Sequence, residues 1–114
     1  MPDSFPIPDG FRKAHVHGDF VAFNGPLYGR LSGDSISLGF RVEQRHTNPM
    51  GICHGGMLAA FVDMLVPCTA MYASGRERRF LPTISLQIDY LGPSKLGAWV
   101  QGEAQILRTT RNMV

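Results

Sequence analysis

The sequence has few of the features that mark secreted or membrane proteins. It contains two cysteines, Cys53 and Cys68, which are too few for a disulfide framework in a chain of 114 residues. Residues 1–6 lack the basic and apolar regions of a secretory signal. The longest apolar stretch, residues 57–73, is interrupted by a carboxylate and a proline and is too short to span a bilayer. We therefore expect reduced thiols, a cytoplasmic location and no membrane partner.

Charged residues are also scarce. They make up 18% of the chain, below the roughly 25% typical of soluble domains. The net charge of +2 is too small and too dispersed to indicate nucleic acid as a partner. With 44% hydrophobic residues, the composition excludes intrinsic disorder and fits one compact domain. The low charge indicates that another subunit covers part of the surface.

Three segments alternate apolar and polar residues with the period of a strand that has one buried face. They are residues 35–43, 83–91 and 98–107. The turn-forming residues 92–97 predict that the last two segments pair as antiparallel neighbours. Residues 1–26, rich in Pro, Gly and Phe, predict a loosely structured arm or a short helix.

One helix is predicted between the first two of these strands, over about residues 54–72. It has no polar face, so we expect it to be buried nearly all round and wrapped by the sheet. Pro67 lies inside it and lacks the N–H that would bond the Asp63 carbonyl, which predicts a kink at that turn. These elements together predict the α+β class.

Asp63 is the charged residue that interrupts this apolar helix, and its helical neighbours three and four residues away include no cation. A carboxylate that is buried without a partner is a better base, and such groups concentrate at functional sites. The alternative is a carboxylate that accepts a hydrogen bond from a hydroxyl or backbone donor of another element. Asp63 is therefore the candidate general base.

The loop of residues 45–56 ends on the helix N-terminus, where Gly55 and Gly56 leave backbone N–H groups uncovered. These donors and the helix dipole favour developing negative charge, as an oxyanion site for a thioester or ester carbonyl requires. Asn48 is a candidate for a further, side-chain donor. Close packing of the helix against a neighbour is the alternative explanation for the two glycines.

His54 suits three roles, as a base, as a ligand or as a residue that positions the loop. His46, Cys53, His54 and Asp63 do not have the spacing of a recognised zinc site, so we expect no metal. The side chains of the adjacent Cys53 and His54 diverge, which disfavours a cysteine nucleophile. Both Cys53 and Cys68 are expected to pack as small apolar residues.

The geometry of an α-helix places two of the candidate groups, the Asp63 carboxylate and the Gly55 N–H, far apart. Asp63 lies eight residues beyond Gly55, which corresponds to roughly 12 Å at 1.5 Å per residue. Catalysis at one carbonyl needs both groups within about 3 Å of the reacting atoms. If both are used, one of them must come from a second copy of the chain. We therefore expect a homodimer in which the N-terminus of one helix faces the middle of the other.

From about Phe23 to its last residue, the chain resembles the hotdog-fold acyl-CoA thioesterases of the phenylacetate-pathway PaaI type, within the 4-hydroxybenzoyl-CoA thioesterase superfamily. The resemblance rests on Asn48, the His-Gly-Gly at residues 54–56, the acid nine residues after that histidine, and the predicted strand at 83–91. The family pattern His-Asn-Pro-X-Gly-X-X-His-Gly-Gly is loosened here to His-Thr-Asn-Pro-Met-Gly at residues 46–51.

This resemblance implies hydrolysis of a fatty or aromatic acyl-CoA to the free acid and CoA. It implies no cofactor, because CoA is part of the substrate. Asp63 would activate water or attack the thioester carbonyl, and the Gly55 N–H would be the oxyanion donor. Asn48 would help to position the thioester or its water, and His54 would order the loop. Thr83, from the same chain as Asp63, would hold the water or the acid.

The CoA moiety would contact Gly56 and the arginines Arg76, Arg79 and Arg108, although an ordinary solvated loop also explains these arginines. Other functions remain open. A non-catalytic module that binds acyl-CoA in the same cleft is the main alternative. A hotdog hydratase or dehydratase is another, but the Gly-Gly after His54 argues against it.

The fold implied by the resemblance is a long helix wrapped by an antiparallel sheet, in dimers that often form a homotetramer. It divides the chain into an N-terminal arm or short helix at residues 1–26 and a hotdog domain at residues 27–114. Family members usually continue for two more strands, so we expect the sheet to be incomplete after its third main strand. The edge left by that strand must then be covered by something else.

Overall fold

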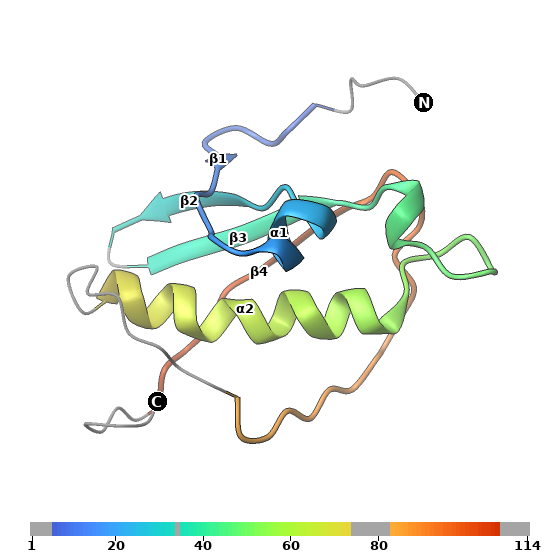
Figure 1. Cartoon of the computed structure of the whole chain (residues 1–114). Coiled ribbons are helices and arrows are strands. Elements are labelled where there is room, and N and C mark those ends of the chain that lie inside the picture. The colour runs from blue at the N-terminus through green and yellow to red at the C-terminus, as the bar shows by residue number, and fades with distance from the viewer. Residues whose placement is uncertain (1–5, 34, 74–82, 108–114) are drawn as a thin grey trace.

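The computed structural model describes residues 6–33, 35–73 and 83–107. An antiparallel four-stranded sheet lies over one long helix (Figure 1), as the α+β class requires. Across the sheet, the strand order is β1 (Arg12–Lys13), β2 (Tyr28–Ser32), β3 (Ser35–Arg41) and β4 (Trp99–Gly102). The helices are α1 (Asp19–Asn24), the short 3-10 helix η1 (Gln44–His46) and α2 (Gly55–Ala73).

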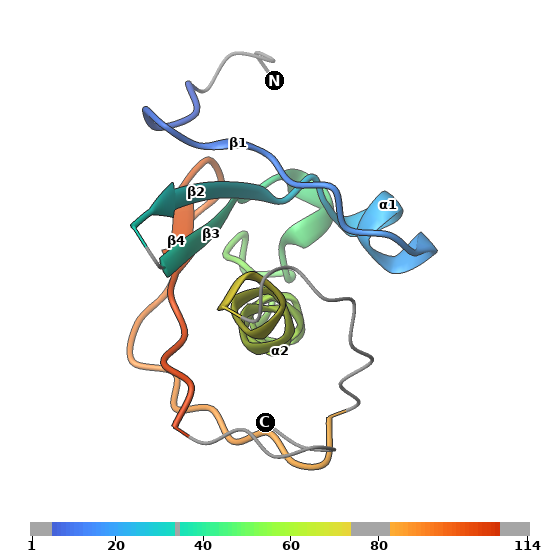
Figure 2. The same cartoon turned by 90° about the vertical axis from the view of Figure 1, so that its left-hand side faces the viewer.

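The long helix α2 confirms the helix expected from the apolar run, and Pro67 lies inside it. Its buried residues Met57, Phe61 and Leu65 recur every four positions and form one stripe. Burial all round is a wrong expectation, because Val66 on the helix is 39% exposed. The sheet covers one side of α2, and irregular segments pass around the other side (Figure 2).

The side chains of α2 pack closely against β4 at Gly102. A Cβ atom on Gly102 would lie 3.1 Å from Leu65 Cδ1 and 3.6 Å from the Phe61 ring. The absence of a side chain at Gly102 therefore makes room for the bulky side chains of α2. Phe61 also packs on Phe40 of β3, with ring centroids 5.0 Å apart. These contacts form the centre of the core.

Residues 83–91 do not form the expected strand. Within the described part of the chain, no strand pairs with this segment, so its backbone has no ladder to join. Its alternating apolar side chains lie largely in solvent, with Ile84 82% exposed and Leu91 95% exposed. The expected pairing of this segment with residues 98–107 is therefore also wrong.

The strand found in residues 98–107 is shorter than expected and has a different neighbour. It is β4, which pairs antiparallel with β3 in the register Leu38↔Gly102 and Arg41↔Trp99. The confirmed strand at residues 35–43 therefore takes β4 as one neighbour, and β2 is the other. Sequence patterning misses β2, because Gly29 interrupts the apolar positions of its inner face.

The outer face of the sheet holds the N-terminal arm. Trp99 lies over Gly39, where any side chain would clash with the indole ring. Phe11 of the arm meets Trp99 edge to face, with centroids 5.1 Å apart. The Arg41 guanidinium lies 5.2 Å from the Trp99 ring centroid. Aromatic and cation–π contacts therefore attach the arm to β4 and β3.

We expect Gly102→Val to destabilise the fold by about 1–3 kcal/mol, because the added side chain overpacks Leu65 and Phe61. Urea denaturation followed by circular dichroism measures the change in the free energy of unfolding. The matched control is Gln101→Val on the adjacent, exposed position of β4, which should change that free energy by less than about 1 kcal/mol. Equal losses in both variants would contradict the close approach of α2 at Gly102.

Candidate active site

The first turn of α2 keeps one backbone donor uncommitted. His54 Nδ1 accepts the Gly56 N–H at 2.7 Å, and the His54 carbonyl accepts the N–H groups of Met57 and Leu58 at 2.9 and 3.2 Å. Among the described residues, the Gly55 N–H has no acceptor. This N–H lies at the positive end of the helix dipole, as an oxyanion donor must. His54 caps the helix and thereby orders this turn.

Tyr90 covers the same turn, and sequence reasoning missed it. Its hydroxyl donates to the Gly55 carbonyl at 2.8 Å, and its ring lies 3.5 Å from the position that a Cβ on Gly55 would take. In the sequence, Tyr90 only continues the apolar alternation of residues 83–91. The contact of Tyr90 with Gly55 depends on the path of residues 83–91 past α2, and local sequence patterns do not predict that path.

The loop before α2 is shaped by Asn48. The side-chain oxygen of Asn48 accepts the Met50 N–H at 2.9 Å, and its backbone N–H donates to the Ile52 carbonyl at 2.8 Å. Gly51 in the same turn has a φ of 76°, a conformation that favours glycine. The Asn48 amide NH₂ has no acceptor among the described residues. It therefore remains a candidate donor beside the helix start.

His46 is a structural residue of this loop. It is 2% exposed, and its ring meets Phe40 edge to face. Nδ1 accepts the Glu43 N–H at 3.0 Å, which assigns the proton to Nε2, and Nε2 donates to the Asn24 carbonyl at 2.6 Å. Burial lowers the pKa of His46. The His46 carbonyl accepts the His54 N–H at 2.7 Å, so the neutral imidazole ties the arm to the start of α2.

Asp63 and Thr83 come together on the middle of α2. The Thr83 hydroxyl donates to Asp63 Oδ1 at 2.5 Å. Asp63 is half-buried and Thr83 is exposed. In the described part of the chain, Asp63 forms no ion pair and its Oδ2 has no donor. One carboxylate oxygen of Asp63 thus accepts a hydrogen bond from a hydroxyl of another element, which is the alternative that the sequence left open. The other oxygen has no such partner among the described residues and can accept a proton.

The structure therefore gathers the predicted residues into two groups on one helix. His54, Gly55 and Gly56 lie at the start of α2, while Asp63 lies at its middle and accepts the hydrogen bond of Thr83. An intact helix between them keeps the groups about 12 Å apart. One chain cannot bring both of them to the same carbonyl carbon.

Arg76, Arg79 and Arg108, expected to contact CoA, lie outside the described residues. Cys53 is buried and Cys68 is half-buried. Burial raises the pKa of both thiols, which keeps them protonated and poorly nucleophilic.

Among residues 6–33, 35–73 and 83–107, no cluster of three or more His, Cys, Asp or Glu side chains is placed to hold a metal ion. No described helix is both long enough and apolar enough to cross a membrane.

Comparison with known proteins points to one family. The model of the thioesterase superfamily matches residues 50–114, which is more than half of the chain. Human acyl-coenzyme A thioesterase 13 is 32% identical over 77 residues, which cover 64% of this chain and 51% of that protein. The chain thus spans about half the length of this relative.

Solved structures agree with the fold. Zebrafish thioesterase superfamily member 2 aligns with a TM-score of 0.63 and 28% identity, over 75% of this chain and 61% of that chain. Mouse thioesterase superfamily member 2 aligns with a TM-score of 0.68 and 23% identity, over 82% of this chain and 67% of that chain. The sheet and central helix described above therefore form a hotdog fold.

We expect stability to fall in mild acid because of His46. Above the unfolded-state pKa of 6.5 the imidazole is neutral in both states. As the pH falls below 6.5, the unfolded chain gains a proton that the folded chain accepts only at lower pH. The free energy of unfolding then decreases by up to about 1.4 kcal/mol for each unit by which the folded pKa is lowered.

Urea denaturation at pH 7.5 and 5.5 measures this loss in the parent and in His46→Gln. The variant keeps a donor and an acceptor but cannot titrate, so it should lose less stability between the two pH values. An equal loss in both proteins would assign the acid sensitivity to other groups.

Proposed function

Because the chain belongs to the thioesterase superfamily, we propose that it hydrolyses a fatty or aromatic acyl-CoA to the free acid and CoA. The observation that carries the proposal is the pair of groups on α2. The helix start offers an uncommitted Gly55 N–H, and the helix middle offers a carboxylate oriented by a hydroxyl. The name of the related acyl-coenzyme A thioesterase 13 supports the same substrate class.

The proposed chemistry assigns one step to each group. Asp63 Oδ2 takes a proton from a water molecule while the water oxygen attacks the thioester carbonyl carbon. The Gly55 N–H stabilises the negative charge that develops on the carbonyl oxygen. The attack produces a tetrahedral intermediate. When this intermediate collapses, the C–S bond breaks and CoA leaves as the thiolate, which takes up the proton that Asp63 removed from water. The Thr83 hydroxyl positions the carboxylate, and Asn48 helps to position the thioester.

We further propose that the site is shared between two copies of the chain. The separation of about 12 Å along α2 supports an arrangement in which Asp63 of one copy and Gly55 of the other meet at one thioester. The low charged fraction and the exposed apolar side chains of residues 83–91 are consistent with coverage by another subunit. A homotetramer of the PaaI type and a cytoplasmic location remain predictions.

Asp63→Asn should lower kcat by about 10²–10⁴-fold, because the amide cannot take a proton from water. Thiol release from short, long and aromatic acyl-CoA esters measures the rate and also identifies the acyl group. Asp89→Asn is the matched control, since Asp89 is an exposed carboxylate outside the site. If Asp63→Asn turns over as fast as the parent, Asp63 is not the base. Acyl-CoA binding without thiol release in the parent would instead indicate a non-catalytic binding module.

Gly55→Pro should lower kcat by about 10²–10³-fold, because proline removes the one N–H assigned to the oxyanion. Proline is well tolerated at the first position of a helix. Gly55→Ala is the matched control, since it keeps the N–H and its Cβ would lie at an ordinary 3.5 Å from Tyr90. Equal rates for the alanine and proline variants would exclude this N–H from the chemistry.

Mixing these two inactive variants tests whether the site is shared. In a mixed dimer of Asp63→Asn and Gly55→Pro, one shared site carries both changes and the other carries neither. An equimolar mixture should then recover roughly a quarter of the parental activity once subunits exchange. If both residues act within one chain, every site stays damaged and no activity returns, although each variant is folded.

A further inference from the structure

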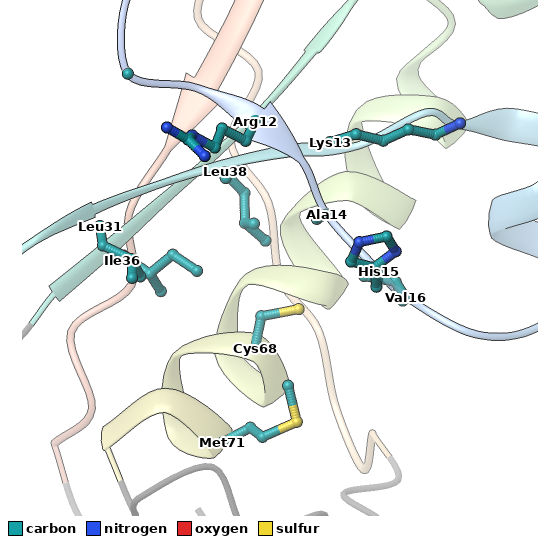
Figure 3. A pocket seen from close by; sticks show the side chains of 12 residues that line it. Arg12, Lys13, Ala14, His15, Val16, Leu31, Ile36, Leu38, Cys68 and Met71 are labelled. Carbon is teal, nitrogen blue, oxygen red and sulfur yellow. The ribbon is translucent and has the colours of Figure 1, made fainter.

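A cavity of about 620 Å³ lies between the sheet, the C-terminal half of α2 and the N-terminal arm (Figure 3). Leu31, Ile36 and Leu38 contribute its sheet wall, and Cys68 and Met71 contribute its helix wall. The N-terminal arm passes along its mouth. Its size falls in the range of roughly 300–1,000 Å³ that holds small organic ligands. The candidate active site does not use this space.

The mouth of the cavity is positively charged. Arg12 and Lys13 of the arm line it, and both side chains are exposed. His15 lies beside them. Within the described part of the chain, neither cation has a carboxylate partner, and the nearby Asp9 is exposed and unpaired as well. The two side chains extend in opposite directions from the arm (Figure 3), and Arg12, whose strand partner Gly29 also lines the cavity, is the cation on the cavity side.

Helix geometry separates this cavity from the candidate active site. Cys68 lies seven residues beyond Phe61 and so shares the stripe of α2 that faces the sheet. Asp63 is five residues before Cys68, or about 140° away around the helix axis. Its partner Thr83 belongs to the segment that passes on the far side of α2 (Figure 2). A ligand in the cavity would not reach Asp63 past the helix.

We propose that this cavity binds an anionic amphiphile of the fatty-acid type. The aliphatic chain lies between the sheet wall and the helix wall, where burial of each methylene group is favourable. The anionic head stays at the mouth and pairs with Arg12. This binding requires neither Asp63 nor hydrolysis, so a protein without thioesterase activity still binds the amphiphile here.

Isothermal titration of the full chain with dodecanoate tests the proposal. Octanoate should bind more weakly, by about three- to fourfold for each methylene group removed. Neutral dodecanol should bind about three- to tenfold more weakly than dodecanoate, because it lacks the paired charge. Dodecyl phosphate distinguishes the head groups: tighter binding than dodecanoate assigns a phosphate head, and weaker binding assigns a carboxylate. Affinity that is independent of chain length overturns the proposal.

Two pairs of variants locate the binding. Cys68→Trp fills the cavity from α2 and should abolish binding, whereas Val66→Trp adds the same ring at an exposed position of the helix. Arg12→Gln should weaken dodecanoate binding about three- to tenfold. Lys95→Gln lowers the net charge by the same amount on an exposed turn and should leave the affinity unchanged.

Thermal melts followed by circular dichroism verify that each variant is folded. If Cys68→Trp fails to fold, Met71→Trp blocks the same wall and replaces it. Unchanged dodecanoate affinity in a folded Cys68→Trp or Met71→Trp would overturn the assignment to this cavity.

Discussion

The neutral imidazole of His46 holds the start of α2 and the loop before it in place. One ring nitrogen bonds the backbone after β3 and the other bonds the end of α1, while the His46 carbonyl bonds the backbone of His54. The backbone of Asn24, Glu43 and His54 is therefore bonded to one buried residue. Because both ring nitrogens are engaged in a buried site, loss of either bond leaves a costly unpaired polar group. The position of the α2 start, and hence of the Gly55 N–H, depends on this junction.

The helix α2 fixes the relative positions of the candidate site residues and of the cavity. It fixes the distance between its two polar groups, and it divides the space around it into two compartments. On one side, Phe61 and Leu65 pack against the sheet, and the apolar cavity continues this layer toward the helix end. On the other side, Asp63 and Thr83 meet away from the core. The proposed hydrolysis and the proposed binding of an amphiphile thus occur on opposite faces of one element.

Local patterns predicted the two elements with the most regular alternation of apolar and polar residues or the longest apolar run. The alternation around Leu38 and Phe40 predicted β3, and the uninterrupted apolar run predicted α2 together with its outlying Asp63. The prediction of a strand at residues 83–91 is wrong, because a strand forms only beside a partner and the local sequence does not indicate which partner is present. The neighbour of β4 was wrong for the same reason. The contact of Tyr90 with Gly55 also depends on long-range packing, and so it carries no local signal.

The arrangement around Trp99 has a spectroscopic consequence. The chain contains one tryptophan, so its ultraviolet-excited indole emission arises from a single point on the outer face of the sheet. That indole lies between Phe11 of the arm and Arg41 of β3. Its emission wavelength and quenching therefore report how the arm is seated on the sheet. The protein thus carries a built-in optical label at the contact between its arm and the sheet.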